Sequence, residues 1–377
     1  MDDSARDTAR DTADGPAGDL AAGPVKPVDC AGDLTRDWLQ AALRHAGHDV
    51  TLTRLEVEPV GTGQLSVSLR ARFGLAAPVA GCPASVVVKL PAADPARRAY
   101  LRRAYLSELG FYHELAATVD VDVPACHLAV ATSDASAFTL ILEDLAPAVP
   151  GDQIAGATVA QVAGAIRNLA GLHAPRWCDP ALRESPWFAT QDAASNQGLA
   201  VMFPQLVPVV AERLGAALSA QDHETLGQVG PVLGAFFTAR PHRYSMIHGD
   251  YRLDNLLFSP DGRVRAVDWQ TLAVGLPARD LAYVIGTSLP PGDRRAAEAS
   301  LVEGYWQELA RRGVAGYSAA ECFEDYRLGM LQAPFIAVLG LAVGTPSERG
   351  DAMFAAMIAR SCAAIRDLGT IELAAAG

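Results

Sequence analysis

Alternation of apolar and polar positions, or a short apolar run, marks five segments in the first 143 residues. Such patterns are typical of strands. Turn-forming Gly, Pro, Ser and Asp separate the segments, so we expect strands near residues 55–59, 65–73, 85–90, 126–131 and 137–142. Helical spacing appears at residues 34–46 and 96–118. The pattern predicts a five-stranded antiparallel sheet with one long helix and a shorter helix before it.

Residues beyond 150 show mainly helical spacing. The segment 158–173 places Val162, Ile166 and Leu169 on one stripe, with Thr158 as its N-cap. His173, at its C-terminal end, is expected to interact with the helix dipole. Further helices are predicted near residues 204–218, 222–240, 278–288, 293–313, 318–343 and 347–367. A small sheet followed by a helical region predicts an α+β fold.

The chain has 377 residues, which is too long for one ordinary hydrophobic core. The patterns above divide it into a tail and two lobes. Residues 1–30 contain few large apolar side chains and are expected to form a disordered tail. We expect an N-terminal lobe over residues 31–143, a linker over residues 144–150 and a helical C-terminal lobe over residues 151–377.

The irregular region 175–200 carries three large aromatic residues, Trp177, Trp187 and Phe188. Such side chains can line the mouth of a substrate site or pack over a helical lobe. Packing is the favoured interpretation.

Composition narrows the choice of partners. The net charge of −12 and the pI of about 5.1 argue against nucleic acid or an anionic membrane as a partner. Six cysteines lack the Cys-x-x-Cys spacing of zinc or redox sites, and no secretory signal pattern is visible. The longest apolar run, near residues 333–343, is too short to span a bilayer. We expect a cytoplasmic monomer or homodimer.

One segment combines the residue types that phosphoryl transfer requires. His248-x-Asp250 is followed by Asn255 and, after a turn, by Asp268, each flanked by apolar runs. A carboxylate at 250 can accept the proton of an attacking hydroxyl, while an amide at 255 and a carboxylate at 268 can hold Mg²⁺. Each residue alone is equally compatible with an ordinary turn. Their order between apolar runs favours the catalytic interpretation, with His248 bracing the loop through hydrogen bonds.

The motifs His248-Gly-Asp-Tyr-Arg-Leu-Asp-Asn255, Val267-Asp-Trp-Gln270 and Arg279-Asp-Leu-Ala-Tyr283 resemble the aminoglycoside phosphotransferase and choline kinase superfamily. They look most like its ecdysteroid-kinase-like branch. The resemblance implies a bilobal protein-kinase-like fold whose N-terminal lobe binds ATP or GTP. It also implies Arg252 as a catalytic residue beside Asp250, and Asp280 as an anchor of the loop.

The resemblance further assigns nucleotide-binding residues in the first lobe. Lys89, at the end of a predicted strand, is expected to contact the α- and β-phosphates. Glu108 on the following helix is its expected partner, with Glu114 as the alternative. Gly61 and Gly63 form either a loop that covers the nucleotide or an ordinary hairpin turn.

Glu143 and Leu145 fall where the hinge of a kinase would contact the adenine edge through its backbone. The function implied is Mg²⁺-dependent transfer of the γ-phosphoryl group from ATP or GTP to a hydroxyl of a small molecule.

Two functional classes remain. The first is a small-molecule kinase acting on a hydroxylated metabolite or antibiotic, with an aminoglycoside as the second choice of acceptor. The other is an inactive nucleotide-binding scaffold, which the complete set of motif residues disfavours. A hydrolase is disfavoured too, because the chain contains no Gly-x-Ser-x-Gly motif.

Overall fold

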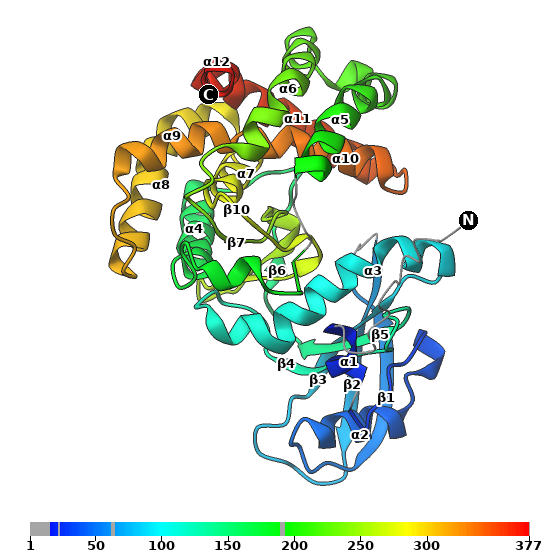
Figure 1. Ribbon diagram of the computed structural model, residues 1–377. Coiled ribbons are helices and arrows are strands. Elements are labelled where there is room, and N and C mark those ends of the chain that lie inside the picture. The colour runs from blue at the N-terminus through cyan, green and yellow to red at the C-terminus, as the bar shows by residue number, and fades with distance from the viewer. Residues whose placement is uncertain (1–15, 22, 62–64, 189–192, 377) are drawn as a thin grey trace, which may run out of the picture. The chain divides into compact units, whose positions relative to one another are not determined.

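The computed structural model describes residues 16–21, 23–61, 65–188 and 193–376. Its chain forms two compact units (Figure 1). The first unit contains the described residues up to Gly110 together with Cys126–Glu143. The second contains Phe111–Ala125 and the described residues from Asp144 onward.

The first unit is built on a five-stranded antiparallel sheet, as the sequence predicts. Its strand order is β1-β2-β3-β5-β4, so β3 lies at the centre with β2 and β5 as neighbours. The strands are β1 Leu52–Pro59, β2 Ser66–Leu75, β3 Ser85–Pro91, β4 Cys126–Ala131 and β5 Phe138–Glu143.

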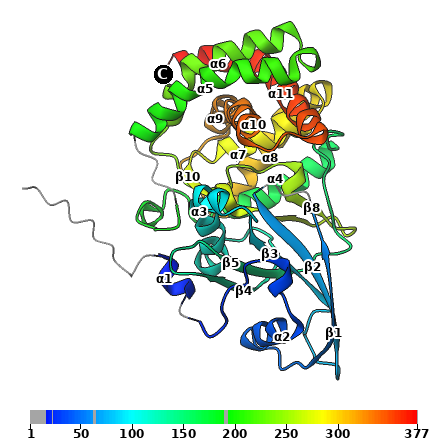
Figure 2. The ribbon, with the colours of Figure 1, turned by 90° about the vertical axis from the view of Figure 1, so that its right-hand side faces the viewer.

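Three α-helices accompany this sheet: α1 Pro16–Ala21, α2 Arg36–His45 and α3 Pro95–Gly110. Helix α2 begins after Thr35, whose side chain accepts a hydrogen bond from the Trp38 backbone N–H at 3.2 Å. Its buried Leu39 and Leu43 join the core formed by the sheet, and α2 lies beside β1 (Figure 2). This burial of apolar surface is the main force that holds α2 on the sheet.

Two expectations for this region are wrong. The disordered tail does not extend to residue 30, because α1 is helical and Val25 and Val28 are buried in the core. The backbone N–H of Val28 also donates to the Thr139 hydroxyl at 2.8 Å. A few apolar residues are therefore enough to hold a mainly polar segment against the apolar face of a neighbouring sheet. Residues 1–15 and 22 lie outside the described part of the chain.

The second error concerns the helix predicted over residues 96–118. It ends at Gly110 and continues as a π-helix over Phe111–Leu115 and a 3₁₀ turn over Ala116–Thr118. The wider turn buries Phe111, Tyr112 and Leu115 together in the second unit. Tertiary packing has overridden the regular helical period here.

The second unit is mainly helical, and three of its helices begin with a capping box. One of these caps is the predicted Thr158, which is reciprocated by Gln161. The helices are α4 Val159–His173, α5 Ala193–Leu214, α6 Ala220–Thr238, α7 Ala278–Ser288, α8 Pro291–Arg311, α9 Ala319–Gly329, α10 Gln332–Val343, α11 Glu348–Leu368 and α12 Thr370–Ala375.

Most predicted helix bounds in this unit are close to those observed, with two differences. The predicted helix at 318–343 is interrupted at Met330–Leu331 and forms α9 and α10. Helix α5 begins eleven residues earlier than predicted and contains Pro204 and Pro208. Trp187 and Phe188 are buried, as the packing interpretation requires.

Short strands complete the second unit. Strand β7 Ser245–Ile247 pairs with β10 Ala273–Gly275, and β8 Leu256–Phe258 pairs with both β6 Val149–Pro150 and β9 Val264–Ala266. All of these pairs are antiparallel. The strands frame the segment that carries the predicted catalytic motif.

Two helical stretches, Ala194–Ala217 and Ala319–Val343, are long and apolar enough to cross a membrane by length and composition. The second is 67% buried within the protein, as a core helix would be, and the first is 17% buried. Two such helices are weak evidence for a membrane protein. The expected cytoplasmic location stays a prediction.

Candidate active site

The predicted catalytic motif forms a loop between β7 and the 3₁₀ turn Leu253–Asn255. Gly249 adopts a φ of +82°, and a Cβ at this position would lie 2.5 Å from the Thr271 carbonyl oxygen. Both the left-handed backbone and the lack of space require glycine. The geometry therefore explains why the second residue of this motif has no side chain.

Asp280, in the first turn of α7, holds this loop by its backbone. The carboxylate is fully buried and accepts hydrogen bonds from the N–H groups of His248 at 2.6 Å and Gly249 at 2.9 Å. Burial by itself would raise the pKa of Asp280, but hydrogen bonds from the His173 side chain and the His248 backbone lower it overall. Asp280 therefore occupies the anchoring position that the family resemblance implies.

His173 belongs to the same buried network. Its Nε2 lies 3.4 Å from the Asp280 carboxylate, and its Nδ1 lies 2.6 Å from the Tyr305 hydroxyl. The sequence predicts a helix-dipole contact for this residue, whereas the structure shows a side chain with two specific partners. The partners lie on α7 and α8, more than 100 residues away, so helical spacing gives no sign of them.

His248 braces the loop through its own side chain. Its Nδ1 accepts from the Asp250 backbone N–H at 3.3 Å, and its Nε2 donates to the Val267 carbonyl at 3.1 Å. This pattern is that of a neutral imidazole, and it agrees with the predicted bracing role. The Trp269 ring packs between His248 and Phe111, at centroid distances of 4.6 and 3.6 Å.

The Asp250 carboxylate accepts hydrogen bonds from three side chains. Arg252 Nε lies 3.1 Å from both carboxylate oxygens, Asn255 Nδ2 lies 2.9 Å from Oδ2, and the Tyr283 hydroxyl lies 2.7 Å from Oδ1. Arg252 also donates to Asp254 at 2.9 Å. Burial alone would lower the pKa of Arg252, but the nearby carboxylates raise it above its usual range. The arginine therefore remains a cation beside the candidate base.

Asn255 and Asp268 are brought close together by a backbone hydrogen bond between their two segments. The carbonyl of Asn255 accepts from the N–H of Val267 at 3.0 Å, which places Asp268 one residue from this bond. Asp268 adopts a left-handed conformation with φ of 69°, a strained state for a residue with a side chain. The structure thus brings together the three residues on which the predicted site depends.

The donor set fits Mg²⁺. The amide nitrogen of Asn255 is used by Asp250, so its amide oxygen is the atom suited to a metal. No group of three or more His, Cys, Asp and Glu side chains suitable for a metal occurs among the described residues. Mg²⁺ does not require such a cage, since it commonly binds one or two protein oxygens together with substrate phosphates and water.

Lys89 and Glu108 form a buried ion pair in the first unit. Lys89 lies on the central strand β3, and its Nζ is 2.7 Å from Glu108 Oε1 and 2.6 Å from Oε2. Both residues are less than 10% exposed. Glu114, the alternative partner, instead accepts a hydrogen bond from the Trp187 indole at 2.6 Å. The pairing of Lys89 with Glu108 is thereby observed, while its catalytic role stays a prediction.

The remaining nucleotide-binding candidates lie at or beyond the ends of strands β1 and β5. Gly61, with φ of +76°, lies in the hairpin connection after β1, while Gly63 is outside the described residues. Glu143 ends β5, and Leu145 is buried with its carbonyl bonded to the Ala148 N–H at 2.9 Å. The roles of these four residues stay predictions.

Several residues that support the loop were not apparent from the sequence. Gln332 Nε2 donates to the Gly249 carbonyl at 3.0 Å, and Arg279 in turn donates to Gln332. Gln153 accepts from the Leu253 N–H at 2.9 Å. Each contact joins segments 53 to 100 residues apart, so no local spacing could reveal it.

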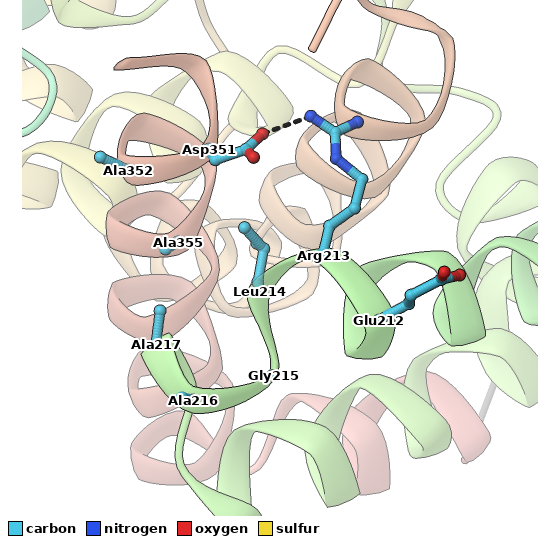
Figure 3. Close-up of a pocket in the computed structure, with 9 residues that line it drawn as sticks. All are labelled: Glu212, Arg213, Leu214, Gly215, Ala216, Ala217, Asp351, Ala352 and Ala355. Atoms are coloured by element: carbon cyan, nitrogen blue, oxygen red, sulfur yellow. Dashed lines mark hydrogen bonds and ion pairs between the residues drawn. The ribbon is translucent and has the colours of Figure 1, made fainter. Parts of the chain in front are cut away.

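A shallow open pocket of about 360 Å³ lies elsewhere in the second unit, between α11 and the end of α5 (Figure 3). Two of its three charged residues, Arg213 and Asp351, form an ion pair with each other. Met353 of α11 contacts Arg252 from the opposite face of the helix. The pocket is therefore separate from the Asp250 contacts.

A small antiparallel sheet, a helical unit and a buried His-Gly-Asp loop are the features of a kinase-like fold. A model of the phosphotransferase enzyme family matches residues 79–321, which is more than half of the chain. The chain therefore belongs to the phosphotransferase enzyme family. This membership confirms the resemblance to aminoglycoside phosphotransferases and the expectation of a phosphotransferase, whereas the ecdysteroid-kinase-like branch stays a prediction.

Solved structures of other phosphotransferases are similar to this chain. The microcompartment-associated aminopropanol kinase is 21% identical and has a TM-score of 0.55, and the match covers 89% of this chain and 98% of that one. The macrolide 2′-phosphotransferase of Brachybacterium faecium is 22% identical, with 85% and 97% coverage and a TM-score of 0.48. The first of these likenesses confirms the predicted α+β fold.

One curated relative shares a short segment. Acyl-CoA dehydrogenase family member 10 of Mus musculus is 48% identical over 46 residues. The segment is 12% of this chain and about 4% of the mouse protein. The likeness therefore extends to a small part of that protein.

Proposed function

We propose that this protein is a kinase that transfers the γ-phosphoryl group of ATP or GTP to a hydroxyl of a small molecule. The observation that carries the proposal is the Asp250 carboxylate, which is held by Arg252, Asn255 and Tyr283 within a loop anchored on Asp280. Such a rigid carboxylate suits a reaction that depends on positioning more than on covalent chemistry.

Asp250 orients the acceptor hydroxyl and takes its proton. The hydroxyl oxygen forms a bond to the γ-phosphorus while the bond to the β,γ-bridging oxygen breaks, and the nucleoside diphosphate leaves. Arg252, already a cation at this carboxylate, stabilises the charge that builds up on the transferring group. Its guanidinium has five N–H donors, so it can serve the phosphoryl group and Asp254 together.

Asn255 and Asp268 would hold the metal. Mg²⁺, when bound, neutralises negative charge on the nucleotide phosphates. Both residues supply oxygen atoms, which this cation prefers. Their placement along the Asn255–Val267 backbone pairing supports this assignment.

The first unit supplies the contacts to the nucleotide. Lys89, braced by Glu108, binds the α- and β-phosphates, and Gly61 and Gly63 approach the phosphates through their backbone. Glu143 and Leu145 contact the adenine edge through their backbone. We assign residues 31–143 as the nucleotide-binding lobe, 144–150 as the hinge and 151–377 as the catalytic and substrate lobe. The break between the two compact units at Glu143 and Asp144 supports the C-terminal bound of the first lobe, whereas Phe111–Ala125 belong to the second unit.

The acceptor is a hydroxylated metabolite or antibiotic, with an aminoglycoside as the second candidate. A protein of similar fold is an aminopropanol kinase, and fold alone does not decide the substrate. A coupled nucleotide assay across hydroxylated acceptors, followed by NMR location of the new phosphate, would identify it. An inactive scaffold is not favoured, because Lys89, Asp250, Asn255 and Asp268 are all present.

Asp250→Ala tests the proposal. We expect it to lower the rate of transfer at least about a hundredfold, the lower limit for a general base, because the acceptor loses its proton acceptor. Nucleotide binding, measured by calorimetry, should persist. Asp261→Asn, in an exposed turn, serves as the control. Undiminished single-turnover transfer in the Asp250→Ala protein would refute the assignment.

A further inference from the structure

Tyr283 contacts the candidate base from inside the protein core. It lies on α7, is fully buried, and donates its hydroxyl to Asp250 Oδ1 at 2.7 Å. Asp280, one helical turn earlier, binds the backbone of the same loop. Residues three apart lie on the same face of a helix, so α7 holds both the backbone of the loop and its carboxylate.

The three side chains that donate to Asp250 differ in how they constrain the orientation of its carboxylate. Arg252 Nε is 3.1 Å from both oxygens and therefore does not distinguish between them. Tyr283 bonds Oδ1 and Asn255 bonds Oδ2, so this pair determines the rotation of the carboxylate about its last bond. The pair would keep that rotation even if Arg252 turned toward a phosphoryl group.

We infer that Tyr283 is a positioning residue, which holds the Asp250 carboxylate in the orientation needed to accept the proton of the acceptor hydroxyl. The inference rests on the proposed kinase function. It adds a residue from α7, outside the catalytic loop, to the groups that determine the rate of transfer.

The hydroxyl of Tyr283 stays protonated under working conditions. Burial raises its pKa well above the ordinary value, and the negative charge of Asp250 raises it further. Tyr283 is therefore a permanent donor to an acceptor carboxylate, and it does not compete with Asp250 for the transferred proton.

The test is Tyr283→Phe, which removes the hydroxyl and keeps the ring. Because the acceptor is unidentified, the reaction measured is Mg²⁺-dependent transfer from ATP to water. We expect kcat to fall about tenfold to a hundredfold, the equivalent of one hydrogen bond to a charged group, with KM for ATP within about twofold. Loss of folded protein would also lower the apparent kcat at an unchanged KM, so each rate is divided by the folded fraction measured by circular dichroism.

Tyr326→Phe is the matched control. Tyr326 is also fully buried and also donates to a carboxylate, that of Glu298 at 2.9 Å, but it lies on α9 and its partner lies on α8 rather than in the loop. We expect this variant to lose thermal stability while kcat stays near that of the wild type. An equal fall of kcat in both variants would overturn the inference.

A double-mutant cycle with Asp250→Ala supplies a readout that does not depend on activity. Tyr283→Phe should lower Tm in the wild-type background and have little or no effect in the Asp250→Ala background, because the partner is already gone. The two rate losses should likewise fail to add.

The outcomes distinguish a failure of the positioning role of Tyr283 from a failure of the proposed kinase function. An active wild type with unchanged kcat in Tyr283→Phe, or additive losses of Tm, would refute the positioning role and leave the kinase proposal intact. A wild type that transfers no phosphoryl group from ATP or GTP to water or to any hydroxylated acceptor tested, although the Tm coupling is present, would refute the kinase function on which the inference rests.

Discussion

Gly249 shows how one backbone conformation limits the choice of residue in the catalytic loop. Gly249 has a φ of +82°, and its N–H and that of His248 donate to the two oxygens of Asp280. A side chain here would collide with the Thr271 carbonyl. The sequence motif predicts a glycine at this position, but the steric requirement for it comes from Thr271, which lies 22 residues further along the chain.

Gly249→Ala should destabilise the protein and abolish transfer. Gly262→Ala is the matched control, because Gly262 has a φ of +84° and open space around its Cβ position. Both variants incur the cost of a left-handed alanine, roughly 1–2 kcal/mol. We expect Gly249→Ala to lose a further 1–3 kcal/mol from overpacking, measured by chemical denaturation. Equal losses in the two variants would contradict the contact with Thr271.

Helix α7 is the element that organises the site. Its observed bounds, Ala278–Ser288, are those predicted from the sequence, since Pro277 precedes the helix and Pro290 follows it closely. Its apolar spacing does not show that Asp280 and Tyr283 face the loop, because every residue of this helix is buried. The local sequence pattern therefore predicts the helix, whereas the segments packed against it determine what each of its polar residues binds.

Asp280→Asn tests the link between α7 and the loop. The pKa of Asp280 is lower in the folded chain than in the unfolded chain, so the carboxylate adds stability above the unfolded value of about 3.9. That contribution disappears as the pH falls through the folded pKa. The variant should lose about 2–3 kcal/mol at pH 7 and depend less on pH below 4.

Denaturation curves at pH 7 and at pH 3–4 would measure both effects. Asp261→Asn makes the same change of charge in an exposed turn and should alter stability by less than about 0.5 kcal/mol. A loss for Asp280→Asn that is the same at both pH values would show that its ionised form is not what stabilises the loop.

At the scale of the whole molecule, the residues proposed for phosphoryl transfer belong to two compact units. The first carries the buried pair of Lys89 and Glu108, and the second carries Asp250, Asn255 and Asp268. Lys89 is one of two lysines in a chain with many arginines. A buried lysine in such a sequence indicates a need for a compact ammonium that arginine does not meet.

Lys89→Ala should raise KM for the nucleotide by at least about tenfold, the effect of losing one charged contact, and it also leaves Glu108 buried without its counter-ion. Lys89→Arg should not restore binding, because the guanidinium differs in size and geometry. The other lysine, Lys26, is exposed, and Lys26→Ala should leave KM unchanged. Steady-state kinetics with varied ATP would measure all three, and an unaltered KM in Lys89→Ala would exclude the phosphate contact.

The amino-acid sequence by itself determined the five strands of the first unit, most of the helices and the predicted catalytic motif, because these depend on local period, turn residues and short spacings. Tertiary structure alone decided which buried groups meet: Glu108 with Lys89, His173 with Asp280, and Tyr283 with Asp250. It also decided that Val25 and Val28 are ordered and that the helix after Gly110 widens into a π turn. Such contacts join residues far apart in the chain, where burial and hydrogen-bond satisfaction outweigh local preference.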